Sequence, residues 1–283
     1  MQTHSPLNII VADDRSTDNT EEVVAHYKDD SKVVYHRNQV NSGRVGNYRK
    51  LLYEYAQTAE WYVNLDGDDY FTDKEFISYA LSLVQQDMES FVVFFQGNHK
   101  LHILKEVFPD AKQLDSDSFL IDGKDYFLRF YKVRKFTHLA TMYKASVARS
   151  VGFYNYDCLS TDFHSLCRLA LNGKVILSSR NVGVWVEHSN NESKALDKEM
   201  IKKELGSLDD IAQYGRSYFN ETIINNWLNK MRHYYYQRLF YQIGKGKVCL
   251  RDLSFALRHF QFNYLYFTCV GRIVLKLCGI HLT

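Results

Sequence analysis

The sequence predicts an α/β protein, in which helices flank a mixed, mostly parallel β-sheet and a helical, basic extension follows. Three observations carry this prediction. Short apolar runs alternate with helix-like segments over much of the chain, two of the early runs end in groups of carboxylates, and the C-terminal part is rich in cations. In a parallel α/β sheet, residues that follow the carboxyl ends of the strands line the ligand crevice, so the carboxylates mark the expected site.

The elements are predicted from the spacing of apolar residues. A short apolar run favours a strand, and a period near 3.6 favours an amphipathic helix. The first strand covers residues 8–12, and a helix from about Glu21 to Asp29 follows it. Further strands are expected at 33–35, 61–65, 91–95, 175–177 and 182–186, and further helices along 45–55, 76–84 and 163–170, the last ended by Asn172-Gly173. Residues 101–135 have a mixed pattern that predicts no element.

The composition excludes several classes of protein. The chain has two prolines, and no apolar run reaches the ~18 residues that a membrane-spanning helix needs. The N-terminus lacks the apolar core of a signal peptide. The five cysteines show no close-paired metal spacing, so we expect free thiols in a reducing compartment. These features predict a cytoplasmic protein, either free or attached peripherally to the inner face of the plasma membrane.

Charge divides the chain unequally. Residues 213–283 contain ten Lys and Arg against two acidic residues, a net charge of +8, and because the whole chain carries +2, residues 1–212 carry −6. We therefore expect a catalytic domain over 1–212 and a basic, aromatic-rich helical extension over 213–283. Cations mixed with aromatic and aliphatic residues suit an anionic membrane surface, and a pair of amphipathic helices packed on the catalytic domain is the alternative. No recognition motif supports nucleic-acid binding, and we expect none.

Two groups of carboxylates define the expected chemistry. Asp13 and Asp14 end the first strand, and Asp66, Asp68 and Asp69 follow the third. Carboxylates gathered at one edge of a sheet repel one another unless a cation joins them, and hard divalent cations prefer oxygen ligands. The sequence therefore predicts a metal-assisted site, with Mn²⁺ or Mg²⁺, for a phosphorylated ligand. A solvated acidic turn is the alternative for either group taken alone.

Three motifs follow one another along the chain: Asp13-Asp14-Arg15-Ser16-Thr17-Asp18-Asn19-Thr20, then Asn41-Ser42-Gly43 with Asn47, then Leu65-Asp66-Gly67-Asp68-Asp69. In this order they resemble the motifs of the family 2 glycosyltransferases, which have the GT-A fold. Arg15 stands where the family usually has Gly. The resemblance spans roughly residues 8–190, and the three motifs together are far more specific than any one of them. It implies an inverting transfer of a sugar from a nucleoside-diphosphate donor, expected to be a UDP-sugar, to a glycan or lipid-linked glycan in bacterial surface polysaccharide synthesis.

The resemblance also assigns the nucleotide-binding residues. Asp13 would accept a hydrogen bond from the nucleotide base, with Asp14 near the same rim and Asn47 supplied by the second motif. Arg44 would pair with a phosphate or the base edge through its planar guanidinium. As alternatives, Asp14 or Asp18 caps the following helix, and Arg44 is a solvated surface residue.

The metal site is assigned in the same way. Asp68 would be the direct ligand, with Asp66 contacting the ribose or a metal-bound water. His188 resembles the late His of the family, which reaches the metal or the diphosphate, and a structural hydrogen-bonding His is the alternative. A divalent metal held there clamps the diphosphate and stabilises the leaving group.

The acceptor side needs a general base. The family has Glu-Asp before a helix that contains Arg, and this chain has Thr161-Asp162 before a helix that contains Arg168. Asp162 would take a proton from the acceptor hydroxyl as that hydroxyl attacks the anomeric carbon, whereas Thr161 replaces the Glu. The alternative is that Asp162 caps this helix. Asp69 would orient the acceptor or its loop, and Trp185 would stack on a sugar.

From the resemblance, we expect this chain to lack the family's first strand and helix. The chain opens at Met1-Gln2-Thr3-His4-Ser5-Pro6, which aligns with the end of that helix. A missing strand leaves backbone groups unpaired at about 1–3 kcal/mol for each buried group, so we expect low stability and weak activity. Full activity and a cooperative melt of the chain would refute this expectation.

Two other classes of protein compete with this reading. A phosphorylation-receiver module also has an acidic pair after its first strand, but Asp66 lies in a cluster and no Lys-bearing strand is in the right place; resistance to phospho-donor labelling would exclude it. The second is a degenerate, inactive transferase-like binding protein. Metal-dependent hydrolysis of the donor would separate it from an enzyme.

Overall fold

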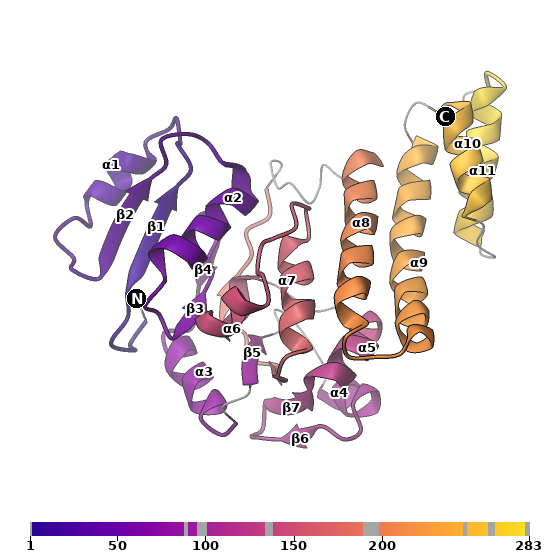
Figure 1. Cartoon of the computed structure of the whole chain (residues 1–283). Helices are drawn as coiled ribbons and strands as arrows, with labels where there is room; N and C mark the ends of the chain where they lie inside the picture. Colours follow the sequence, from indigo (N-terminus) through magenta and orange to yellow (C-terminus); the bar gives the residue numbers. More distant parts are fainter. Residues whose placement is uncertain are drawn as a thin grey trace. The chain divides into compact units, whose positions relative to one another are not determined.

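The computed structural model describes residues 2–87, 90–94, 101–133, 138–188, 198–245, 248–259 and 264–280 (Figure 1). The chain forms two compact units. The first comprises Met1–Asp157 and Thr161–Val186, and the second Cys158–Ser160 and Glu187–Thr283. The structural division thus lies at 186/187, whereas the change in charge at 212/213 falls inside helix α8, Lys198–Gly215.

The first unit begins with a parallel βαβ arrangement. Strand β1 (Ile9–Asp13) pairs with β2 (Val33–Arg37) in register from Ile9↔Val33 to Asp13↔Arg37, and helix α1 (Thr20–Ala25) connects them. These two strands form a sheet of their own, visible beside α1 in Figure 1. The register brings Asp13 and Arg37 to the same end of the sheet.

Helix α2 (Gly43–Lys50) follows and continues as a π-helical turn, η1 (Leu51–Tyr55). Val45, Tyr48 and Leu52 are buried, as their helical spacing predicts. Single π-helical turns occur often at functional sites, and this one directly follows a helix that carries two expected site residues.

A six-stranded sheet forms the centre of the first unit. Its order is β3-β8-β5-β9-β7-β6. The bounds of its strands are β3 Trp61–Val63, β5 Ser90–Phe94, β6 Lys112–Gln113, β7 Ser118–Asp122, β8 Thr141–Lys144 and β9 Lys174–Ser178. The expected strand at 91–95 is therefore β5, with Phe95 outside the described residues.

The α/β class with mixed sheets and flanking helices is confirmed, but the mostly parallel pairing is corrected. Among the described strands of the six-stranded sheet, only β5 and β9 pair in parallel, and the other four ladders are antiparallel. The alternation of strands and helices in the sequence is a local property, whereas the direction of a neighbouring strand depends on connections of many residues. Strand β8 enters between β3 and β5 from residues far along the chain and runs opposite to both.

Helices cover both faces of the sheet centre. Helix α3 (Phe76–Val84) buries Phe76, Ala80 and Leu83 in one cluster with Met142 of β8 and Ile176 of β9. Neighbouring strand residues point to opposite faces, and both neighbours of Ile176 in β9 are also fully buried. Each such side chain contributes about 1.5–3 kcal/mol through burial.

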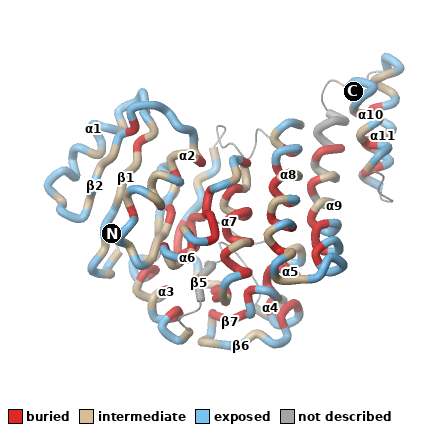
Figure 2. Tube along the Cα trace, viewed as in Figure 1, coloured by how far each residue is buried: buried red, intermediate tan, exposed pale blue. Residues whose placement is uncertain are grey.

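Helices α4 (Leu101–Val107), α5 (Gly123–Val133) and α6 (Ala145–Ser150) complete the first unit together with the 3₁₀ turn η2 (His138–Ala140) and helix α7 (Thr161–Ala170). Helix α7 is buried along most of its length (Figure 2). Its end agrees with the stop predicted at Asn172-Gly173, because the Asn172 side-chain amide donates to the Arg168 carbonyl at 2.8 Å.

Helices make up most of the described residues of the second unit. Helix α8 packs against α9 (Glu221–Lys245), and α11 (Tyr264–Leu277) packs against both α9 and α10 (Leu250–Arg258). Within the described ranges, no helix combines the length and apolar character needed to cross a membrane. Residues 246–247, 260–263 and 281–283 of the expected basic extension lie outside the described residues.

Candidate active site

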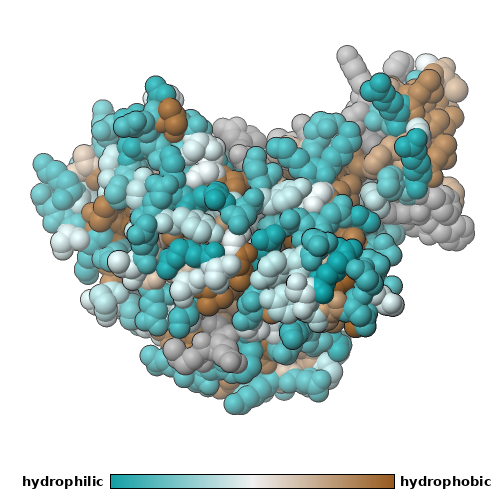
Figure 3. All heavy atoms as spheres, viewed as in Figure 1, coloured by the Kyte–Doolittle hydropathy of each residue, from teal (hydrophilic) through white to brown (hydrophobic). Residues whose placement is uncertain are grey.

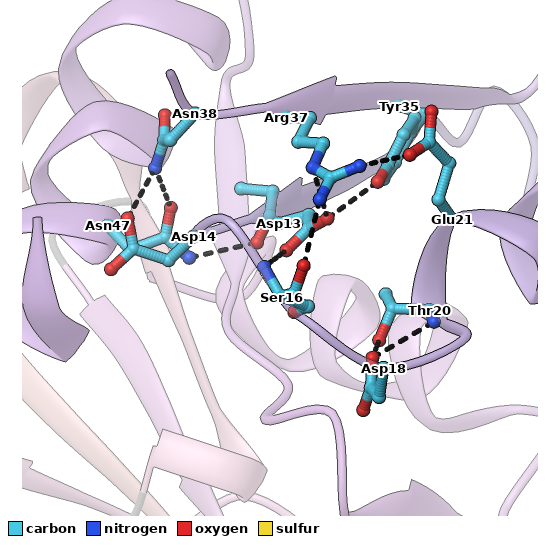
Figure 4. A network of polar contacts seen from close by, with 11 residues as sticks. Asp13, Asp14, Ser16, Asp18, Thr20, Glu21, Tyr35, Arg37, Asn38 and Asn47 are labelled. Carbon is cyan, nitrogen blue, oxygen red and sulfur yellow. Dashed lines mark hydrogen bonds and ion pairs between the residues drawn. The ribbon is translucent and has the colours of Figure 1, made fainter. Parts of the chain in front are cut away.

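The first carboxylate pair is held by the turn after β1. Asp13 is buried, and its carboxylate accepts hydrogen bonds from the Ser16 backbone N–H at 2.7 Å and the Tyr35 hydroxyl at 2.6 Å, with Arg37 Nε at 3.5 Å (Figure 4). Burial raises the pKa of Asp13, but these hydrogen bonds and the Arg37 charge outweigh it and lower the pKa below its usual value. The carboxylate is therefore ionised and fixed in direction before any ligand binds.

Arg15 adopts a left-handed backbone conformation in this turn, with φ of +65°. Glycine reaches this region without strain, and other residues occupy it less readily. The turn thus keeps the shape that the family's usual Gly would favour, although Arg15 occupies the position.

Asp14 joins the turn to the N-terminus of α2. Its carboxylate accepts hydrogen bonds from the Ser42 backbone N–H at 2.8 Å and the Ser42 hydroxyl at 2.8 Å, and from Asn38 Nδ2 at 2.8 Å. Burial raises the pKa of Asp14, but the hydrogen bonds from Ser42 and Asn38 have the larger combined effect and lower it. The helix that Asp14 holds is α2, and not the helix that directly follows it in sequence.

Asn47 completes this polar group from within α2. Its Nδ2 donates to the Ala12 carbonyl at 2.9 Å, and its Oδ1 accepts from Asn38 Nδ2 at 3.0 Å (Figure 4). Lys50 Nζ donates to Asn38 Oδ1 at 3.0 Å. Asp14, Asn38 and Asn47 therefore bind the end of β1 to α2 through side chains that sequence spacing alone does not bring together.

The loop after β3 that contains Asp66, Asp68 and Asp69 is called the acidic loop. Tyr48, the residue after Asn47 in α2, binds this loop. The Tyr48 hydroxyl donates to Asp66 Oδ1 at 2.5 Å, and Asn64 Nδ2 donates to the same oxygen at 3.2 Å. The Arg44 guanidinium lies over the Tyr48 ring, 5.6 Å from its centroid. Asp66 is half-buried, and Asp68 is exposed at the tip of the loop. Two of the expected site residues, Arg44 and Asp66, thus both contact Tyr48.

Asp69 fastens a distant segment to the acidic loop. Its Oδ1 accepts a hydrogen bond from the Val186 backbone N–H at 2.9 Å. Strand β4 (Tyr70–Phe71) also pairs antiparallel with β10 (Gly183–Val184). The structure therefore places Trp185 beside the acidic loop, with 49% of its surface exposed.

Asp162 lies in the first turn of α7, which begins at Thr161. Thr161 is fully buried and its hydroxyl donates to the Tyr156 carbonyl at 2.9 Å, so it has a structural bond where the family has an acid. Burial holds the pKa of His138 below its usual value, although the charges of Asp162 and Asp66 act to raise it. His138 therefore lies within electrostatic reach of the expected base and of the acidic loop.

His188 belongs to the second unit, and its role toward the metal stays a prediction. Among the residues that the structure describes, no three His, Cys, Asp or Glu side chains form a group that could hold a metal ion. Two carboxylates nevertheless suit Mg²⁺ or Mn²⁺ at a diphosphate, because such ions keep several waters and bind one or two carboxylates together with substrate phosphates. Asp66 and Asp68 fit this chemistry.

Sequence reasoning did not assign a site role to Tyr48, Asn64, Asn38 or His138. Tyr48 was expected only as part of an apolar stripe, and Asn64 only as a strand residue. A signal for both exists, since Asn64 is a polar residue within the segment 61–65 that is predicted as a strand, and Tyr48 is adjacent to Asn47 of the second motif. Burial raises the pKa of Tyr48 most, and the charge of Asp66 raises it further, so the hydroxyl remains a donor.

Comparison with known proteins gives a family and a fold. A model of the family described as Glycosyl transferase family 2 matches residues 1–152, more than half of the chain. No match was found among the curated proteins. The chain is similar to S. aureus TarS 1–349 in complex with UDP-GlcNAc, with a TM-score of 0.59 and 14% identity over 98% of this chain and 84% of that one.

A second solved structure has the same fold. The mannosyltransferase PcManGT from Pyrobaculum calidifontis, in complex with GDP-Man and Mn²⁺, aligns with a TM-score of 0.54 and 12% identity over 97% of this chain and 79% of that one. At these identities the likeness concerns the fold.

Proposed function

The chain belongs to glycosyl transferase family 2 and is a glycosyltransferase of the GT-A fold, and we propose that it transfers a sugar from a UDP-sugar to a hydroxyl of a glycan or lipid-linked glycan with inversion. One observation supports this most. Adjacent residues of α2, Asn47 and Tyr48, contact the end of β1 and the acidic loop, respectively. One rigid helix thus joins the expected base-binding end to the expected phosphate end of a nucleotide site.

Donor binding would use residues near both contacts of this helix. Near β1, Asp13 and Asp14 are ionised acceptors whose remaining lone pairs suit the N–H of a nucleotide base. Arg44, in the first turn of α2 with its guanidinium over the Tyr48 ring, would pair with a phosphate. The donor is thereby fixed in orientation before the acceptor arrives.

The acidic loop would hold the metal that the two carboxylates fit. Asp68 would be the direct ligand, and Asp66 would contact the ribose or a metal-bound water. When bound, Mn²⁺ or Mg²⁺ supplies positive charge that stabilises the departing diphosphate. The protein holds Asp66 in place with two hydrogen bonds, and Asp68 is exposed on the same loop.

Asp162 would serve as the general base on the acceptor side. It would remove the proton from the acceptor hydroxyl as the oxygen attacks the anomeric carbon from the face opposite the diphosphate. Trp185, exposed beside the acidic loop, supplies an apolar face for a sugar ring.

Calorimetry with UDP tests the nucleotide and metal parts of this proposal. We expect the chain to bind UDP more tightly with Mn²⁺ than without it, and Asp68→Ala to abolish the metal-dependent part. Asp110→Ala removes another exposed carboxylate, on the loop after α4, and is expected to bind like the wild type. Metal-independent binding of both UDP and GDP by a folded chain would contradict the proposal.

The acceptor is proposed to be presented at an anionic membrane surface, in surface polysaccharide synthesis. Helices α10 and α11 expose several large apolar side chains: Leu250, Leu257, Tyr264, Phe267 and Val274. Figure 3 shows hydrophobic residues gathered over these two helices. Arg251 and Arg258 are exposed on α10, and each cation near an anionic surface contributes about 1 kcal/mol to binding.

Vesicle co-sedimentation tests this surface. We expect the chain to bind vesicles of phosphatidylglycerol and phosphatidylcholine, to bind pure phosphatidylcholine weakly, and to be released by salt because the attraction is screened. The double variant Leu257→Asp and Phe267→Asp should reduce binding at least tenfold, because each apolar side chain that no longer enters the membrane removes up to about 1.5–3 kcal/mol of binding free energy. Ile223→Asp, at a partly exposed apolar position of α9, is the matched control. Equal sedimentation of both variants would argue against this surface.

A further inference from the structure

We propose that Tyr48 is a positioning residue that fixes Asp66 where this carboxylate contacts a metal-bound water, so that the metal affinity of this transferase depends on a phenol that touches neither the metal nor the nucleotide. This inference rests on the proposed nucleotide site and goes beyond the roles that the sequence motifs imply.

The contacts of Asp66 carry the inference. A single carboxylate oxygen, Oδ1, accepts both the Tyr48 hydroxyl at 2.5 Å and Asn64 Nδ2 at 3.2 Å. The Tyr62 hydroxyl in turn donates to Asn64 Oδ1 at 3.2 Å. Two donors on one oxygen set the plane of the carboxylate and leave Oδ2 as the oxygen that can face a ligand. Groups that orient the residues around a bound metal, including a carboxylate that holds a metal-bound water, commonly tune metal affinity.

The position of Tyr48 is itself fixed by packing. Only 6% of its surface is exposed. Its ring meets the His138 ring edge-on, with centroids 5.1 Å apart, and the Tyr154 ring at 5.3 Å. Because the ring cannot swing away without opening this cluster, the hydroxyl stays at the position that Asp66 requires.

Helix α2 also links the Tyr48–Asp66 hydrogen bond to the end of β1. Asn47, the residue before Tyr48, is bonded to the Ala12 carbonyl and to Asn38. The distance between the base-binding end and Asp66 is thus set by a single helical segment. A loop in this place would leave Asp66 free to turn toward solvent.

The test compares two phenol deletions. Tyr48→Phe removes the hydroxyl on Asp66, and Tyr143→Phe removes an equally buried hydroxyl whose partner is the Tyr154 hydroxyl at 2.7 Å. The readout is the Mn²⁺ concentration that half-saturates UDP binding, measured by calorimetry. We expect Tyr48→Phe to raise this concentration about tenfold or more and Tyr143→Phe to leave it unchanged. Thermal melts of both variants report any general loss of stability.

A double-mutant cycle separates positioning from a structural role. If Tyr48 acts through Asp66, then Tyr48→Phe should add nothing to the Mn²⁺ dependence of Asp66→Asn. Asn64→Ala, which removes the second donor, should shift the Mn²⁺ dependence in the same direction and covers the case in which Tyr48→Phe does not fold.

The outcomes distinguish the two proposals. A wild-type chain that binds neither UDP nor GDP with Mn²⁺ overturns the nucleotide site, and the inference falls with it. A wild-type chain that binds with Mn²⁺, together with unchanged Mn²⁺ dependence in Tyr48→Phe and Asn64→Ala, overturns the positioning role alone.

Discussion

Replacing Asp162 by Asn is expected to lower kcat for sugar transfer by about 10²- to 10⁴-fold, the usual contribution of a general base. The amide has the size of the carboxylate but cannot take the acceptor proton. Metal-dependent UDP binding should persist, because the residues proposed for the nucleotide site lie on β1, α2 and the acidic loop. Initial-rate kinetics with saturating donor, together with calorimetry, measure the two effects separately.

A nearby carboxylate provides the control for Asp162. Asp157 is exposed five residues before it, and Asp157→Asn should retain the wild-type kcat.

An NMR titration of His138 gives a second readout of the Asp162→Asn substitution, in the absence of substrate. Since the Asp162 charge raises the pKa of His138, Asp162→Asn should move that pKa further down. Wild-type turnover by Asp162→Asn would show that another group is the base.

Replacing Gly123 by Ala is expected to destabilise the first unit by about 3 kcal/mol or more, at the upper end of the cost of overpacking. A Cβ on Gly123 would lie 1.9 Å from the Ala170 carbonyl oxygen and 2.1 Å from that of Gly173. Both neighbours are backbone atoms that cannot rotate away. The start of α5 and the end of α7 would therefore have to separate. Urea unfolding followed by circular dichroism measures the loss.

Gly271 in α11 is the matched control for this substitution. A Cβ there meets no atom within 4 Å, so Gly271→Ala should be neutral or slightly stabilising through helix propensity. If Gly123→Ala unfolded at the wild-type urea concentration, the close approach of α5 to the end of α7 would be wrong. Loss of stability with retained UDP binding would place the damage at the acceptor side, since α7 carries Asp162.

The helix that contains Tyr48 shows which features the sequence predicts and which it does not. The period of Val45, Tyr48 and Leu52 correctly predicts a helix with these residues buried. It does not predict that the Tyr48 hydroxyl meets Asp66, because the period depends on the apolar ring and says nothing of where the polar tip ends. Similarly, Asp14 looks like a cap for the helix that follows it, yet its carboxylate binds Ser42, 28 residues away.

The pairing directions of the strands are a second feature that the sequence does not predict. The segments at 61–65, 91–95 and 175–177 are correctly predicted as strands, since apolar character and length are local. Their neighbours are not local: β8 lies between β3 and β5, and β9 lies between β5 and β7. The mostly parallel sheet expected from strand–helix alternation gives way to mostly antiparallel ladders for this reason.

The sequence by itself determined the family, the α/β class and the acidic residues that identify a nucleotide-sugar enzyme, because these depend on residue types at short, fixed spacings. The tertiary structure alone decided how those residues are used. Asp66 is held by Tyr48 across 18 residues, and Asp69 holds Val186 across 117. A hydrogen bond requires its atoms within a few tenths of an ångström of one distance, and only the packed chain brings groups so far apart in sequence to that distance.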